Sequence, residues 1–107
     1  MAVTSLGANK EFYRWYWLSE NARDNDDYTG LINVVTAVGQ PGGTAAFNTQ
    51  TAQYIDINTW LRANVPTALF GVNDNYLGPF GGQHNALFYF PPGGKAVLFP
   101  WDMDFLN

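Results

Sequence analysis

The sequence predicts an α+β domain in which three to four helices come first and a β-hairpin follows. Apolar residues recur at helical spacing through most of 10–70, with glycine and proline marking the breaks between helices. After these helices, two short apolar runs at 85–90 and 96–99 flank a segment rich in proline and glycine. Helices followed by strands, rather than helices alternating with strands, are typical of the α+β class.

Length and composition predict a single domain over residues 1–107, with residues 1–8 as a flexible lead-in. Hydrophobic residues make up 47% of the chain and aromatic residues 17%, which is enough for a core. Charged residues make up only 13%, against about 25% in ordinary domains. A chain with so many aromatic and so few charged residues must either bury its aromatic rings or expose an apolar surface that binds other surfaces. We therefore expect a homo-oligomer, or a missing lobe or partner chain that covers this surface.

The charge pattern excludes several kinds of partner. The net charge is −4 and the isoelectric point is near 4.5, with five scattered basic residues and no basic patch. Nucleic-acid binding is therefore not expected. Cysteine is absent, so there is no disulfide or thiolate chemistry. No signal peptide or membrane-spanning run is visible, so no membrane partner is expected, and the compartment stays open.

The first predicted helix begins after Asn9, a good capping residue, and runs from Lys10 to about Ala22. Phe12, Trp15 and Tyr16 share one face by their spacing, and other aromatic residues occupy other faces. Aromatic residues on several faces predict a core helix that is buried on more than one side. A platform of aromatic rings for a ligand is the alternative.

The second predicted helix covers Tyr28–Val38 and follows an acidic loop. Asp26 or Asp27 is expected to cap it, because a side-chain oxygen there can accept from the first backbone N–H groups. Calcium binding by the loop is the alternative, but the loop lacks the glycine and distal glutamate of an EF-hand. Gly39, followed by proline, marks the helix end. The predicted buried stripe consists of Leu31, Val34, Val35 and Val38.

Two more helices are predicted before the hairpin. Thr44–Tyr54 has helix-favouring composition. Asp56 or Asn58 then caps a helix that runs to Phe70. Pro66 lies inside this helix, so we expect a kink near 62–65 or two short helices.

The last third of the chain is predicted to be a loop and then a hairpin. Residues 71–82 are punctuated by glycine, asparagine and proline and indicate a loop. Asn85–Phe90 and Ala96–Phe99 are expected to pair as strands, joined by the turn at 91–95.

Most of the chain's polar chemistry lies around this hairpin. Asp102 and Asp104 follow the second strand, and a carboxylate at Asp74 and amides at Asn75 and Asn85 precede the first. Carboxylate and amide oxygens are the ligands that Mg²⁺ prefers. Because side chains alternate along a strand, Asp102 and Asp104 start from the same side of an extended chain. The sequence therefore predicts a divalent-cation site here, with either of these two aspartates as the ligand.

The same region resembles the C-terminal half of the CotH family, the spore-coat-protein-H-like atypical protein kinases. The resemblance covers roughly Tyr54 to the end of the chain and, more weakly, Glu11–Val38. It is carried by four motifs in order: Tyr54-Ile55-Asp56-Ile57-Asn58-Thr59-Trp60-Leu61-Arg62, Gly71-Val72-Asn73-Asp74, His84-Asn85-Ala86-Leu87-Phe88-Tyr89 and Phe99-Pro100-Trp101-Asp102-Met103-Asp104.

The resemblance implies part of a kinase-like C-lobe, with roles for individual residues. Asp74 matches the catalytic-loop aspartate that orients or deprotonates the acceptor hydroxyl. Asn85 and Asp102 match metal ligands, with Asp104 as the alternative to Asp102. The cofactors implied are Mg²⁺ or Mn²⁺ together with ATP, and the location implied is cytoplasmic or spore-associated. Substrate or nucleotide contacts are expected from the two remaining polar residues beside these positions, His84 and Asn75.

The chain also departs from the family. CotH-like kinases are much longer, and the part that binds nucleotide phosphates with a basic residue lies upstream of the region matched here. Lys10 and Arg14 fall on a predicted helix rather than on a strand next to a glycine loop. The sequence therefore predicts a kinase remnant with a metal half-site. The alternative is a non-catalytic module that associates with itself through an aromatic-rich interface.

Two other classes of function, serine hydrolysis and sugar binding, lack the sequence features that they need. A serine hydrolase would need Ser5 or Ser19 with His84, but neither serine has a Gly-x-Ser-x-Gly context. Sugar binding would need several tryptophans exposed on one face, whereas their spacing predicts that most are in the core.

Overall fold

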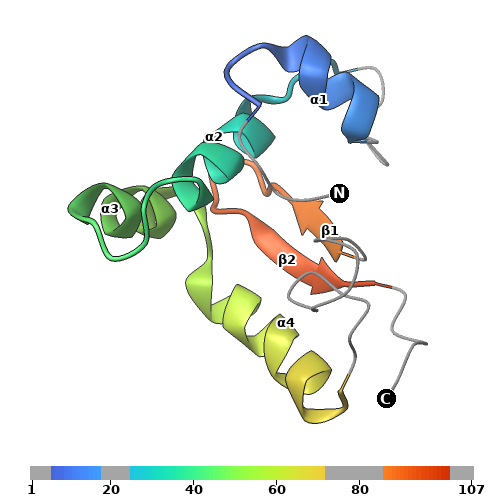
Figure 1. Ribbon diagram of the computed structural model, residues 1–107. Helices are drawn as coiled ribbons and strands as arrows, with labels where there is room; N and C mark the ends of the chain where they lie inside the picture. Colours follow the sequence, from blue (N-terminus) through green and yellow to red (C-terminus); the bar gives the residue numbers. More distant parts are fainter. Residues whose placement is uncertain (1–5, 18–24, 72–85, 102–107) are drawn as a thin grey trace.

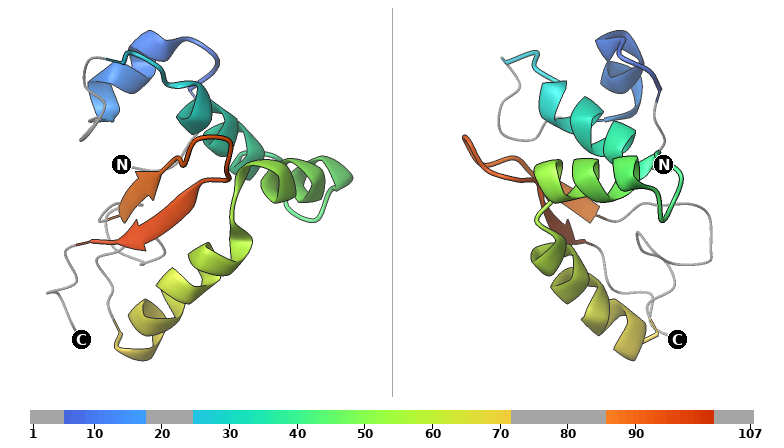
Figure 2. Two further views of the ribbon diagram at one scale, coloured as in Figure 1. Left: turned by 180° about the vertical axis from the view of Figure 1, so that it is seen from behind. Right: turned by 90° about the vertical axis from the view of Figure 1, so that its left-hand side faces the viewer.

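Four helices precede a two-stranded antiparallel hairpin, which confirms the α+β class (Figure 1). The structure is a computed structural model, and it describes residues 6–17, 25–71 and 86–101. The hairpin lies between α2 on one side and α4 on the other, and α3 extends away from it beside α2 (Figures 1 and 2). Within the described residues, no helix has the length and apolarity that a membrane span requires.

Helix α1 (Lys10–Tyr16) is shorter than predicted. Asn9 caps it as expected, because its side-chain oxygen accepts from the Glu11 backbone N–H at 3.1 Å. The helix does not continue to about Ala22, because the backbone of Trp17 is extended, at φ −124° and ψ 121°. This change of direction lets the Trp17 ring pack edge-on against Phe88, with ring centroids 5.5 Å apart.

The buried side of α1 also differs from the prediction. Tyr13 is fully buried, and its hydroxyl donates to the Gly7 carbonyl at 2.8 Å. Phe12 and Trp15, predicted to be core residues, are exposed, Trp15 at 85%. The prediction was wrong because α1 contacts the rest of the molecule along one side only, and that side carries Tyr13.

Helix α2 (Thr29–Val38) ends where predicted but begins one residue later, with Tyr28 rather than an aspartate as the N-cap residue. Leu31, Val34 and Val35 are buried and form the centre of the core. An Asp27 side-chain oxygen accepts from the first helical N–H, that of Thr29, at 2.9 Å. Three residues of the predicted stripe are therefore buried, whereas the fourth, Val38, is half-buried and packs against both core clusters.

Helices α3 (Ala45–Tyr54) and α4 (Ile57–Leu69) are capped by the residues that immediately precede them. Thr44 accepts from a backbone N–H of α3 at 3.2 Å, and Asp56 accepts from one of α4, also at 3.2 Å. α4 is one continuous helix of 13 residues, not two short ones. The helix continues past Pro66, whose carbonyl accepts from the Phe70 backbone N–H at 2.9 Å.

The hairpin consists of β1 (Ala86–Tyr89) and β2 (Val97–Pro100). Its register pairs Ala86 with Pro100 and Phe88 with Leu98. The tight turn between the strands uses Gly93 at a positive φ of 66°, a conformation that glycine adopts without strain. Ile55 joins the edge of β2 by a parallel bridge to Ala96, so the chain between α3 and α4 is tied to the sheet.

The core lies between α2 and the inner face of the hairpin. One cluster joins Tyr13, Leu31, Val35 and Leu98, and a second joins Val34, Ile55 and Ala96. Trp60 and Phe88 pack against both clusters, with their ring centroids 5.5 Å apart. The Trp60 indole N–H also donates to the Ala96 carbonyl at 3.1 Å. Trp60 thereby holds α4 to the start of β2.

Candidate functional site

The six site residues predicted from the sequence all lie outside the described residues. The structure therefore does not test the predicted roles in catalysis, metal binding or nucleotide contact. These residues are Asp74, Asn75, His84, Asn85, Asp102 and Asp104.

The described residues do show where the chain segments that carry them join the fold. Range 72–85 ends at Ala86, and range 102–107 begins after Trp101. Because Ala86 pairs with Pro100, both ranges are connected to the same end of the hairpin.

Among the residues that the structure describes, no three histidine, aspartate or glutamate side chains are grouped as they would be to hold a metal ion. The main charged group is an ion-pair cluster at the start of α1. Asp26 accepts from Lys10 Nζ at 2.8 Å and from Arg14 Nε at 2.7 Å, and Arg14 also pairs with Glu11. Asp26 is thus already neutralised by two cations, which argues against the calcium alternative for this loop.

Asp27 is engaged in a different way. Hydrogen bonds from the Thr29 side chain, and then from its backbone N–H, hold the pKa of Asp27 below its ordinary value of 3.8. The negative charge also lies at the start of α2, where the helix dipole favours it. Both contacts organise the beginning of a helix, so Asp27 has a structural explanation.

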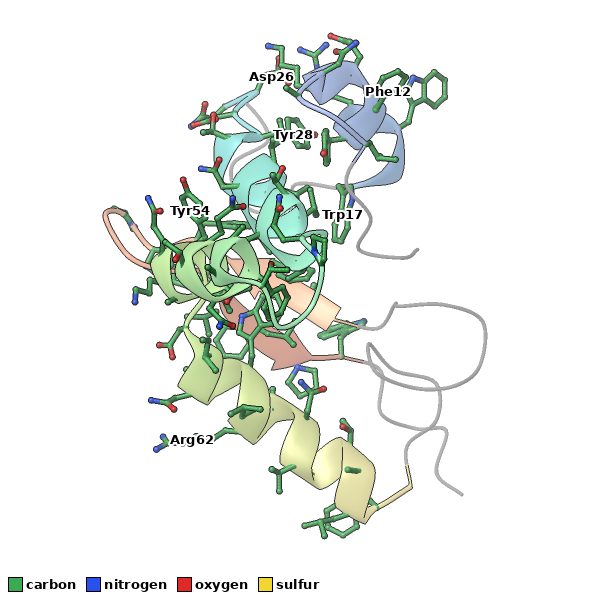
Figure 3. The ribbon with its side chains drawn as sticks, turned by 60° about the vertical axis from the view of Figure 1, so that its left-hand side comes forward. Phe12, Trp17, Asp26, Tyr28, Tyr54 and Arg62 are labelled. Atoms are coloured by element: carbon green, nitrogen blue, oxygen red, sulfur yellow. The ribbon has the colours of Figure 1, made fainter. Side chains whose placement is uncertain are left out.

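The most unusual surface belongs to α4, whose polarity is reversed. Thr67 is buried at 4% exposure, whereas Leu61, Val65 and Leu69 are exposed at 61%, 55% and 76%. With Ile57, also exposed, they recur every four residues along one side of the helix. We call these four residues the α4 stripe. Arg62, the charged residue nearest its middle, projects outward from the same helix (Figure 3).

The buried polar groups of α4 are satisfied within the helix. The Thr67 hydroxyl donates to the Asn64 carbonyl at 2.7 Å, and the Asn64 side chain donates to the Trp60 carbonyl, also at 2.7 Å. Polar residues can therefore face inward without losing hydrogen bonds. Burying these polar groups therefore costs little free energy. The same orientation leaves the aliphatic side chains of α4 exposed on the outer side.

A second apolar surface is the outer face of the hairpin. Leu87 lies opposite Phe99 and Tyr89 lies opposite Val97, so all four side chains point away from the inner face. Leu87, Tyr89 and Phe99 are exposed. An outer sheet face is ordinarily polar, so an apolar one indicates a surface that is covered by something else.

The tryptophans do not form a sugar-binding face. Trp17 and Trp60 both pack against Phe88 in the core, while Trp15 on α1 and Trp101 after β2 are exposed on different elements. Figure 3 shows Trp17 beneath α1 on the side of the core.

Sequence reasoning did not single out the α4 stripe as a surface. The sequence feature that could have revealed it is the uniform spacing of four between its apolar residues. This spacing places them on one side of the helix and the threonines and Asn64 on the other sides. Comparison with protein families, with curated proteins and with solved structures finds no match to this chain. The resemblance to CotH-like kinases therefore remains a prediction that rests on its motifs.

Proposed function

We propose that this chain is a non-catalytic interaction module that associates with itself through exposed apolar surface. The observation that carries the proposal is the reversed polarity of α4, where aliphatic residues face outward and Thr67 faces inward. Aliphatic side chains on the outside of a helix gain free energy only when another surface covers them.

The composition of the surface also supports self-association. Among the described residues, twelve large hydrophobic side chains are exposed, and seven of them are aromatic. Aromatic residues are enriched at protein interfaces, where charged residues are depleted. A chain with only 13% charged residues has little else to keep such surfaces apart.

Sedimentation equilibrium across the micromolar range tests the proposal. We expect the mass to rise with concentration from 11.9 kDa to at least twice that value. The association should resist salt, because apolar contacts are not screened, whereas association through ion pairs would weaken. A constant monomer mass up to the highest soluble concentration would overturn the proposal.

A second candidate function is divalent-cation binding by a kinase-derived half-site that includes Asp102, or alternatively Asp104. The hairpin register supports it, because the ranges that carry Asn85 and Asp102 join the same end of the sheet. Oxygen ligands from two such segments suit Mg²⁺ or Mn²⁺.

Titration calorimetry with Mg²⁺, Mn²⁺ and Mg·ATP tests this candidate. Metal binding that disappears in Asp102→Ala and persists in Asp104→Ala would support the site and select its ligand. Absence of heat for all three titrants would rule out the half-site and leave the interaction module as the function.

A further inference from the structure

We infer that the self-association surface is α4, and that two identical chains meet by packing one α4 stripe against the other. This inference rests on the proposed self-association and specifies both its surface and its geometry. The contact is centred on Leu61 and Val65, the middle pair of the stripe.

The spacing within the stripe determines how it can pack. Residues four apart form a single ridge that is inclined to the helix axis. Two such ridges interdigitate when the helices cross at about −50°, which is the commonest helix packing in globular proteins. A coiled coil would instead need alternating spacings of three and four, and the stripe has only spacings of four. The expected contact is thus a short crossing of two helices.

A second copy is the partner that these features favour. Packing of this class requires the same kind of ridge on both helices, and an identical chain supplies it. A twofold contact places a surface against itself, so like charges within it repel. The stripe is free of charge, and Arg62 lies beside it rather than within it. An uncharged ridge is therefore complementary to its own copy.

The other exposed apolar surfaces are weaker candidates. Phe12 and Trp15 on α1 form only a small pair on a helix of seven residues. The outer hairpin face is larger, but both undescribed ranges are connected to its end, at Ala86 and Trp101. The α4 stripe lies wholly within the described range 25–71.

Charge insertion on the two competing surfaces tests the inference. Leu61→Glu is expected to raise the dimer dissociation constant at least tenfold in sedimentation equilibrium. Leu87→Glu makes the same substitution on the outer hairpin face and should change the constant less than twofold. Circular dichroism on both variants checks that each remains folded, which the exposure of both leucines favours.

The outcomes separate the inference from the proposed function. If Leu87→Glu dissociates the dimer and Leu61→Glu does not, the α4 contact is wrong and self-association stands. If the unmodified chain is monomeric throughout, both are wrong.

Disulfide trapping provides an independent test, because the chain has no cysteine of its own. Leu61→Cys and Val65→Cys proteins are oxidised separately and as a mixture, with Trp15→Cys on α1 as the exposed control. We expect a covalent dimer from at least one α4 combination, because residues near a helix crossing approach within disulfide range. Equal or greater cross-linking of Trp15→Cys would overturn the inference.

Discussion

Helices α2 and α4 each carry an apolar stripe, but the stripe of α2 is buried and that of α4 is exposed. In α2, Leu31, Val34 and Val35 are buried in the core. In α4, Leu61 and Val65 are exposed, while Thr67 is buried. An apolar stripe therefore shows that a helix has a side suited to packing, but it does not show that the chain itself supplies the surface that packs there.

The two helices also differ in how they are held. α2 contributes to both core clusters through aliphatic side chains. α4 is attached mainly through Trp60, which packs on Phe88 and donates to the Ala96 carbonyl. The backbone N–H of Asp56, just before α4, also donates to the Ala96 carbonyl at 2.9 Å, and none of these contacts uses the α4 stripe.

The largest expected difference comes from equivalent truncations in the two stripes. Leu31→Ala should lower the free energy of unfolding by about 2–4 kcal/mol, because it leaves a cavity in the core. Leu61→Ala should change it by less than about 0.5 kcal/mol when measured at concentrations where the chain is monomeric. Urea unfolding of both variants measures the difference. Similar losses for the two would show that the α4 stripe is buried within a single chain.

The next largest effect on stability is expected at Gly30, near the start of α2, where the Phe90 ring packs closely against the helix. A Cβ at Gly30 would lie 2.8 Å from Cδ1 of Phe90, so Gly30→Ala forces the ring to move. We expect a loss of about 1 kcal/mol, since overpacking outweighs the better helix propensity of alanine. Gly42→Ala is the matched control, because nothing lies within 4 Å of its added Cβ. Thermal unfolding in which Gly30→Ala is no less stable than Gly42→Ala would contradict this packing.

The ion-pair cluster that ties α1 to the approach of α2 should contribute less. Asp26→Asn removes the partner of Lys10 and Arg14, whose side chains are partly exposed. We expect a loss of about 0.5 kcal/mol that shrinks as salt is added, because screening weakens exposed pairs. Urea unfolding at low and high ionic strength tests this. A loss that is independent of salt would mean that Asp26 acts through hydrogen bonding alone.

The smallest effect is the pH dependence contributed by Asp27. Its pKa is lowered in the folded chain, so its contribution to stability is complete above the ordinary value of 3.8. That contribution is lost as the pH falls from 3.8 through the lower folded-state pKa. The melting temperatures of wild type and Asp27→Asn should therefore converge at acid pH and differ near neutrality. A difference that stays constant down to acid pH would show that the carboxylate charge is not what stabilises α2.

The sequence by itself determined the order of the elements and most of their boundaries. Caps at Asn9 and Asp56, and the turn before Ala96, act over a few residues, so they can be recognised locally. The predicted site around Asp102 is also a local pattern, but it lies outside the described residues and stays a prediction.

Only the tertiary structure decided which sides of the helices face inward. The extended backbone at Trp17 ends α1 early, and packing along one side buries Tyr13 while leaving Trp15 exposed. The contact of Trp60 with Phe88 orients α4 so that its aliphatic stripe faces outward. These outcomes depend on contacts between residues far apart in the chain, and neither helix propensity nor periodicity carries that information.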